Sequence, residues 1–424
     1  NEVDPQTRAS LLQAGCISID GDTIGSIDAD LFKLCTNNPV WQDFLIEMSK
    51  RSIALGEGSD GIYIDAWYGT YMSLNKPNNG CFCQYCMEGF REYLRAKYSA
   101  EELRGFGIED IDSFDYGDFI RARYLTLYND TRWEVPLFRD FETYQLKSVT
   151  QFWSDAIAEI RAYGMTLGKE IYFSANTAQL YANSLSLAYA LDYLAPEYTY
   201  GSPYRRSPLP YINHIAIPDY KIGTSLGTPV LTIPQSHSSQ TVQLMSRPDA
   251  TNFWKIYTAE AYSARGFALL PYEYGIHWTE PELYFYPNLN ELKKYYDFIS
   301  NNKRYYENLV STSRMAVWYA YKGNTESFYG ICNLLLDAHF QYDVLFAGDD
   351  NWMEDRLTLG ALQRYEVVVL PNTVRLSDKQ VSLLLSYVSL GGNIIAFGEI
   401  GTHNQEGNYP IKRPELESLL TEGS

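Results

Sequence analysis

Four cysteines have the types and spacing of a metal site. Cys81, Cys83 and Cys86 form a C-x-C-x-x-C cluster, and Cys35 lies upstream, just before a predicted helix. Zn²⁺ prefers sulfur ligands, and a closed structural zinc site has four ligands in a tetrahedron. The sequence therefore predicts that these four thiolates bind one structural Zn²⁺, the alternative being four unrelated buried thiols. The other two cysteines, Cys16 and Cys332, lie far apart in apolar segments, which predicts buried free thiols and no disulfide framework.

Three acidic side chains follow short apolar segments in the way that catalytic acids follow buried strands. Asp65 follows 61–64, Glu197 follows 191–195, and Glu273 follows 267–270. Glycoside cleavage requires two carboxyl groups across one anomeric carbon. These three acids are the candidates, and the alternative is that they form ion pairs or bind sugar hydroxyls without catalysis.

Further polar and aromatic side chains occur near the same predicted strand ends. Imidazole and amide groups can hydrogen-bond to sugar hydroxyls, and planar rings can stack on a sugar face. The alternative is an ordinary structural histidine, or aromatic packing at the end of a barrel. The candidate substrate-binding residues are Trp67, Tyr68, Asn176, His237, His277 and Trp278.

Short apolar strands and helices must position these residues. A helix is predicted from Asn38, which can cap it, and Pro39, which suits its first position. Helical periodicity covers 88–98 and 119–163, with a break at Pro136. Strands are predicted at 61–65, 171–175, 191–195, 229–233 and 267–270.

Polar residues at the carboxyl ends of parallel strands are typical of a (β/α)₈ TIM barrel. Five of its eight strands are predicted here. A closed barrel needs eight, and an open sheet would expose its edges. The family resemblance described below implies that the three missing β/α units are the first three. We expect preceding residues, or another chain, to supply them.

A second α/β pattern begins near Ser311. Strands are predicted at 315–319, 342–345, 367–370 and 393–397, and helices at 328–338, 378–390. This predicts a small doubly wound domain over 311–424, after a barrel domain over 1–310. None of its strands is followed by a phosphate-binding glycine motif, so no nucleotide site is expected.

Composition narrows the choice of partners. The chain has 424 residues and a formal net charge of −18, which argues against a nucleic-acid surface. No apolar run approaches the roughly 20 residues of a membrane span. The 37 tyrosines suit sugar stacking. The acidic balance fits a secreted or surface protein, although thiolate zinc sites also occur in the cytosol.

Several of these segments resemble glycoside hydrolase family 42, the β-galactosidases with a zinc-cysteine cluster. The resemblance extends from about Cys16 onward and includes 35–40, 63–65, 81–86 and the carboxy-terminal pattern. It implies a TIM barrel, a structural Zn²⁺ and a flavodoxin-like or class I glutamine amidotransferase-like domain of the trimerisation type. A homo-oligomer, trimer or dimer, is implied as well.

The sequence departs from that family at both catalytic positions. The family's fourth strand ends Ile-Asp-Asn-Glu, with Glu as acid/base, and Trp67 takes that place here. The family's nucleophile Glu falls in 232–237, which contains no carboxylate. The segment 60–65 is instead similar to the nucleophile strand of α-fucosidase-like hydrolases. This implies Asp65 as nucleophile, with Glu197 or Glu273 as acid/base.

The function expected from the sequence is glycoside hydrolysis. The substrate would be an oligo- or polysaccharide, cleaved at O-glycosidic bonds by a retaining two-carboxylate mechanism. The alternative is a catalytically inactive relative that acts as a carbohydrate-binding or structural assembly protein.

Overall fold

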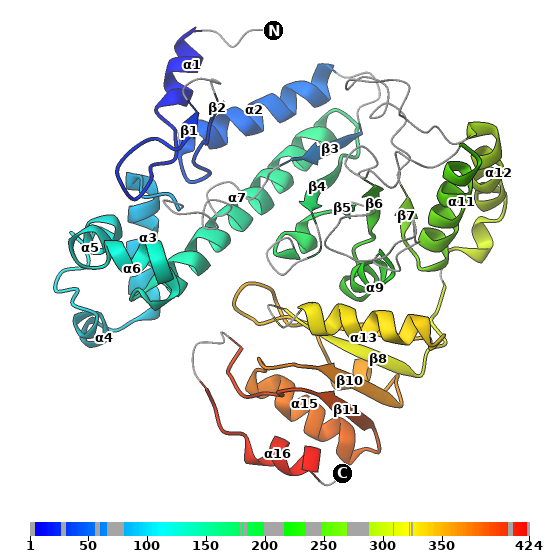
Figure 1. Ribbon diagram of the computed structural model, residues 1–424. Coiled ribbons are helices and arrows are strands. Elements are labelled where there is room, and N and C mark those ends of the chain that lie inside the picture. The colour runs from blue at the N-terminus through cyan, green and yellow to red at the C-terminus, as the bar shows by residue number, and fades with distance from the viewer. Residues whose placement is uncertain are drawn as a thin grey trace. The chain divides into compact units, whose positions relative to one another are not determined.

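The computed structural model describes two compact units, Asn1–Phe173 and Ser174–Ser424, which are treated separately below (Figure 1). The predicted domain boundary near residue 311 stays a prediction. The described residues are 5–26, 31–55, 60–65, 80–178, 180, 185–198, 216–234, 247–268, 288–307, 309–321, 323, 325–405 and 410–421.

The first unit is mainly helical. Its helices are α1 (Pro5–Leu12), α2 (Pro39–Leu55), α3 (Gln84–Lys97), α4 (Ala100–Gly105), α5 (Tyr116–Arg123), α6 (Leu125–Thr131), η3 (Arg132–Glu134) and α7 (Phe138–Thr166). Its strands are β1 (Gly25–Ser26), which pairs antiparallel with β2 (Leu31–Phe32), and β3 (Gly61–Ile64).

Two helix boundaries predicted from the sequence are confirmed. The side-chain oxygen of Asn38 accepts a hydrogen bond from the Val40 amide at 3.0 Å, which satisfies one of the orphan donors at the start of α2. Pro136 lies between α6 and α7, and the next residue, Leu137, has a left-handed φ of 63°. Proline cannot continue the hydrogen-bond ladder, so the helical segment breaks there.

An aromatic core fixes the cysteine loop in the first unit. The ring of Phe82, inside the loop, lies 5.1 Å from the Phe141 ring of α7, measured between centroids. Phe90 of α3 and Tyr116 of α5 pack on the same Phe141 ring, at 5.2 and 5.1 Å. Rings at these separations contribute packing energy beyond their buried area. The loop is therefore held against both α3 and α7.

The five strands predicted before residue 271 are present in the predicted order. They form a sheet ordered β3-β4-β5-β6-β7, and the pairs from β4 onward are parallel. The last four strands are β4 (Tyr172–Ala178), β5 (Tyr193–Tyr198), β6 (Leu231–Pro234) and β7 (Phe267–Ala268). Residues along such strands are apolar on both faces because helices cover them.

Several helical segments accompany these strands along the chain. They are η4 (Ala188–Ala190), α9 (Ala216–Leu226), α11 (Arg247–Ser263), α12 (Leu289–Asn301) and η7 (Lys303–Tyr305). The sequence did not indicate α9, which contains Pro218 in its first turn, where proline is tolerated. No described helix in either unit combines the length and apolar character of a membrane span.

A doubly wound sheet completes the second unit, as predicted. Its elements are β8 (Met315–Ala320), α13 (Thr325–Asp337), β9 (Asp343–Ala347), α14 (Leu359–Leu362), β10 (Val367–Pro371), α15 (Asp378–Ser389), β11 (Asn393–Phe397) and α16 (Pro414–Thr421). The strand order is β11-β10-β8-β9, with every pair parallel. Consecutive residues of a strand point to opposite faces. Trp318 accordingly joins the core that contains Leu384 of α15, whereas the Tyr319 ring lies 4.8 Å from Phe328 of α13.

A half-buried acid in α11, Glu260, predicts a pH dependence of stability. Burial raises the pKa of Glu260 to about 7, against roughly 4.3 for an unfolded glutamate. The contribution of Glu260 to the free energy of unfolding is fully present below the pKa of this residue in the unfolded chain. It is lost as the pH rises through about 7, the pKa in the folded protein. In the wild type, Glu260 should lower the free energy of unfolding by about 2 kcal/mol between about pH 5.5 and about pH 8.5. We expect Glu260→Gln to remove this part of the pH dependence.

Urea titrations of the wild type and the variant at both pH values measure this difference. Glu326→Gln, at an exposed position in α13, is the matched control. An equal pH dependence in the wild type and Glu260→Gln would contradict the assignment.

Candidate functional site

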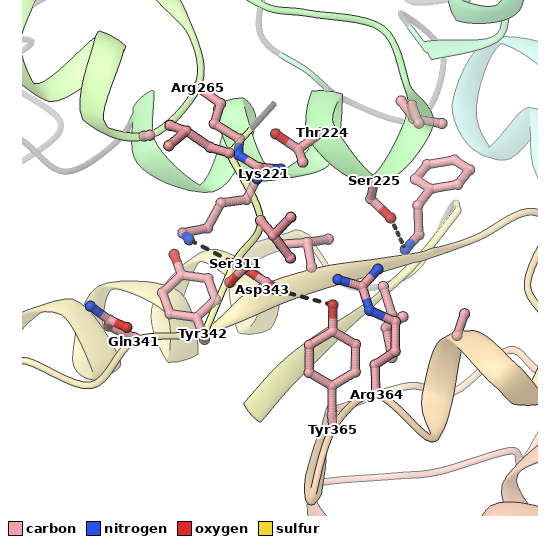
Figure 2. A pocket seen from close by; sticks show the side chains of 18 of the residues that line it. Lys221, Thr224, Ser225, Arg265, Ser311, Gln341, Tyr342, Asp343, Arg364 and Tyr365 are labelled. Atoms are coloured by element: carbon pink, nitrogen blue, oxygen red, sulfur yellow. Dashed lines mark hydrogen bonds and ion pairs between the residues drawn. The ribbon is translucent and has the colours of Figure 1, made fainter. Parts of the chain in front are cut away.

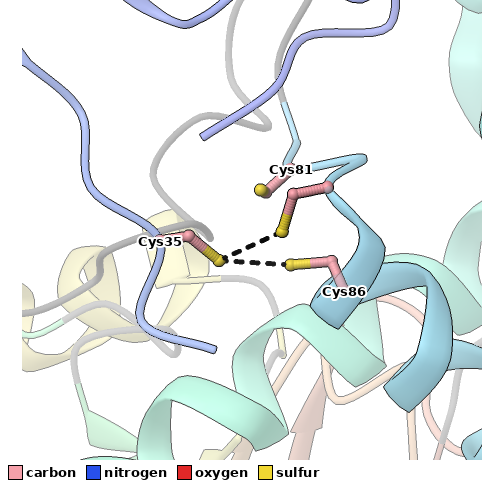
Figure 3. Close-up of side chains that lie close together, drawn as sticks. Cys35, Cys81 and Cys86 are labelled. Carbon is pink, nitrogen blue, oxygen red and sulfur yellow. Dashed lines mark hydrogen bonds between the residues drawn. The ribbon is translucent and has the colours of Figure 1, made fainter. Parts of the chain in front are cut away.

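The four predicted metal ligands come together in the first unit. The Sγ atoms of Cys35, Cys81, Cys83 and Cys86 all lie within 4.8 Å of one another. Cys35 Sγ is 3.5 Å from Cys86 Sγ and 3.6 Å from Cys83 Sγ (Figure 3). Zinc–sulfur bonds of about 2.3 Å in a tetrahedron place the sulfurs about 3.8 Å apart. The donor set and its spacing therefore fit a metal ion such as zinc.

Backbone pairing and a helix start position these sulfurs. The Cys35 amide donates to the Ala14 carbonyl at 2.9 Å, and the Phe82 amide donates to the Ile17 carbonyl at 2.8 Å. One short segment, 14–17, thus holds both cysteine-bearing loops. Cys83 is the N-cap of α3, and Cys86 lies in its first turn. The positive end of a helix dipole favours thiolates at this position.

Asn37 supports the cluster from outside. The backbone amide nitrogen of Asn37 donates to Cys35 Sγ at 3.4 Å, and its side-chain Nδ2 donates to Cys86 Sγ at 3.3 Å. The same Nδ2 lies 3.2 Å from Ser148 Oγ on α7. Donors to ligating atoms orient a metal site and offset its negative charge. The sequence analysis included Asn37 in the family resemblance without giving it this role.

A fifth thiol lies beside the four. Cys16 is fully buried, as predicted, but its thiol interacts with those of Cys35 and Cys81 instead of lying in purely apolar surroundings. The interaction with Cys35 lowers the pKa of Cys16, but the interaction with Cys81 and burial both raise it. The pKa of Cys16 therefore lies well above its usual range. Hydrogen bonds from Cys16 and Cys35 hold the pKa of Cys81 well below its usual range.

Two candidate polar residues meet at the carboxyl ends of β4 and β5. The side-chain Nδ2 of Asn176 donates to Oε1 of Glu197 at 2.8 Å. The register explains the contact, because Asn176 pairs with Ala195, two residues before Glu197. Both side chains are half-buried. A fixed carboxylate at this edge of a parallel sheet is in the position where barrel enzymes place their chemistry.

Asp65 directly follows β3, and its side chain is exposed. In the order of the described strands, β3 stands at the edge of the five-stranded sheet. A side chain at the end of an edge strand has a neighbouring strand on one side only. The remaining candidates, Trp67, Tyr68, His237, Glu273, His277 and Trp278, lie outside the described residues.

Comparison with known proteins places the chain among glycosidase relatives. No model of a protein family matches it. It is 25% identical over 291 residues to an α-agarase from Thalassotalea agarivorans. That alignment covers 64% of this chain and 19% of the agarase, so the chain spans about a fifth of the relative's length.

Solved structures match over nearly the whole chain. The β-galactosidase from the psychrophilic Marinomonas ef1 gives a TM-score of 0.65 at 13% identity, covering 98% of this chain and 67% of that one. The family 42 exo-carrageenase from Bacteroides ovatus gives 0.61 at 12% identity, covering 99% and 61%. The structure therefore matches the TIM barrel and adjoining domain of family 42 enzymes, as the sequence resemblance predicted.

Proposed function

We propose that the protein hydrolyses O-glycosidic bonds of a galactan polysaccharide of the agar or carrageenan type. The observation that carries this proposal is the Asn176–Glu197 pair at the carboxyl ends of neighbouring parallel strands. Similarity to an α-agarase, and a fold shared with an exo-carrageenase, support a polymeric galactan substrate.

In the proposed mechanism Asp65 is the nucleophile and Glu197 the acid/base, with Glu273 as the second candidate for the latter role. Asp65 attacks the anomeric carbon while the acid protonates the departing glycosidic oxygen. A covalent glycosyl ester results. Water, deprotonated by the same residue, then attacks the anomeric carbon and releases Asp65. Two successive inversions retain the anomeric configuration.

Other candidates would bind the sugar rather than react with it. Trp67, Tyr68 and Trp278 would stack on pyranose faces, and His237 and His277 would hydrogen-bond to hydroxyl groups. The four clustered cysteines would hold a structural Zn²⁺, which stabilises the fold and takes no part in the reaction. Residues 311–424 would mediate a homo-oligomer, a trimer or dimer.

A non-catalytic carbohydrate-binding or assembly protein is the second candidate function. Two observations favour it. Trp67 occupies the acid/base position of family 42, and the segment 232–237 lacks that family's nucleophile. A scaffold can outlast its original activity.

Incubation of the protein with agarose, κ-carrageenan and aryl galactosides separates the two functions. We expect new reducing ends from one of the two polysaccharides, measured together with product size by chromatography. Retention of the protein in agarose or carrageenan affinity gels, with no new reducing ends from any substrate, would contradict hydrolysis and support the binding function.

A further inference from the structure

A cavity of about 540 Å³ lies inside the second unit, away from the carboxyl ends of β4 and β5. One wall carries Lys221 of α9 and Arg265, which follows α11, and the opposite wall carries Asp343, Arg364 and Tyr365 (Figure 2). This volume is in the range of cavities that bind small organic ligands. Because the wall residue Arg364 is exposed, the cavity is accessible from solvent.

The charges that line this cavity are mainly positive. Its carboxylate, Asp343, is already satisfied: it accepts hydrogen bonds from Ser311 at 2.8 Å and Tyr365 at 3.1 Å, and it lies 3.8 Å from Lys221. The lining residue Arg356 pairs with Glu354 at 2.7 Å. Arg265 and Arg364 form no ion pair with any described residue. Two guanidinium groups with no ionic partner among the described residues, in a chain of net charge −18, indicate an anion site.

Arg265 occupies a backbone position that favours glycine. Its φ is 66°, in the left-handed region, directly after the end of α11. The Gly266 amide closes the helix by donating to the Ala261 carbonyl at 2.7 Å, as in a Schellman motif. A non-glycine residue at the left-handed C′ position is strained. Strain at this position is a signal of function, because glycine would remove it.

One nitrogen of the Arg265 guanidinium is also unsatisfied. Its Nη2 atom is buried and has no hydrogen-bond partner in the described part of the chain. An arginine after a helix can serve simply to complement the dipole at the helix C-terminus. That role does not explain a buried donor without a partner, which is costly unless an acceptor binds there.

The opposite wall supplies a second cation, Arg364, beside Tyr365, whose hydroxyl donates to Asp343. Burial raises the pKa of Tyr365 to about 12, against the opposing charges of Arg364 and Arg265, which both act on this phenol. Tyr365 therefore stays protonated at neutral pH. Guanidinium groups match the oxygens of sulfate and phosphate in paired hydrogen bonds.

We propose that this cavity binds a sugar-sized ligand carrying a sulfate or phosphate monoester, whose oxygens pair with Arg265 and Arg364. The site lies apart from Glu197 and Asn176, and the proposal does not depend on glycoside hydrolysis.

Isothermal titration calorimetry with galactose 6-sulfate and galactose 6-phosphate tests this site, at constant ionic strength in chloride buffer. Galactose, inorganic sulfate and inorganic phosphate are the comparison ligands. We expect one ester per chain and no heat from galactose. The preferred ester identifies whether sulfate or phosphate is the natural group. Equal binding of galactose, or of the inorganic ions, would overturn the proposal.

Arg265→Gly separates binding from folding, because glycine relieves the left-handed strain while removing the guanidinium. We expect ester affinity to fall about 10- to 100-fold, while Tm stays equal or rises. Arg364→Gln should weaken binding similarly. Arg314→Gln is the control, since Arg314 pairs with Glu366 and does not line the cavity. Wild-type affinity in Arg265→Gly would refute the site.

Discussion

Replacing Asp65 with asparagine is expected to lower the rate of polysaccharide cleavage by at least about a thousandfold, because the glycosyl ester needs a carboxylate nucleophile. Asparagine keeps the size and polarity of the side chain and removes only its charge. Stability should be unchanged, since Asp65 is exposed. Initial rates of reducing-end release, with Tm as the folding check, measure both effects.

The matched control for this substitution is Asp60→Asn. Asp60 is also exposed but lies before the amino end of β3, away from the strand end that carries Asp65. Full activity in Asp65→Asn would remove the nucleophile assignment. An equal loss in both variants would show that a general change of charge, rather than a missing nucleophile, is responsible.

Glu197→Gln tests the other half of the mechanism. General acid/base catalysis contributes about 10² to 10⁴ in rate, so a loss in this range is expected on the polysaccharide. On an aryl galactoside with an acidic phenol the first step needs less proton donation, and the loss should shrink. If Glu273→Gln shows this leaving-group pattern and Glu197→Gln does not, Glu273 is the acid/base.

Replacing Cys86 with serine is expected to remove the bound metal and to destabilise the first unit by several kcal/mol. Structural zinc binding is itself a large part of the folding free energy in small thiolate sites. Elemental analysis should give about one zinc per wild-type chain and almost none in the variant. Urea unfolding, followed by tryptophan fluorescence, measures the loss of stability.

Two further variants make this test specific. Cys332→Ala removes a buried thiol in α13, outside the cluster, and should keep the metal. Because Cys16 lies beside the cluster, it could replace a missing ligand. In the double variant Cys16→Ala, Cys86→Ser, Cys16 can no longer take the place of Cys86 as a metal ligand. Full zinc content in the double variant would contradict the proposed ligand set.

The cysteine cluster was predictable because its residue types and spacing are specific. Three thiols within one short segment, 81–86, leave few arrangements, and the helix start at Asn38 places Cys35 before a rigid element. The Asn37 donors and the position of Cys16 were not predictable. Both depend on pairing between segments that are distant along the chain, which local patterns do not encode.

The strands were predictable for a similar reason, since short apolar runs bounded by turns identify buried strands. α9 was missed, and with it the wall that carries Lys221. The cavity could not be found from sequence at all. Its cations, Lys221, Arg265, Arg356 and Arg364, come from segments with no common motif. Only the folded chain shows that Nη2 of Arg265 has no hydrogen-bond partner among the described residues.

The cluster also has a topological consequence. Cys35 and Cys86 are 51 positions apart, and β3 with Asp65 lies between them. A metal bound by both would cross-link the chain into a ring that contains this strand. Cross-links closing rings of this length stabilise by about 4 kcal/mol through the entropy of the open chain. Metal supplied before refolding should therefore accelerate the recovery of activity more than metal supplied afterwards, although the ion contacts no substrate.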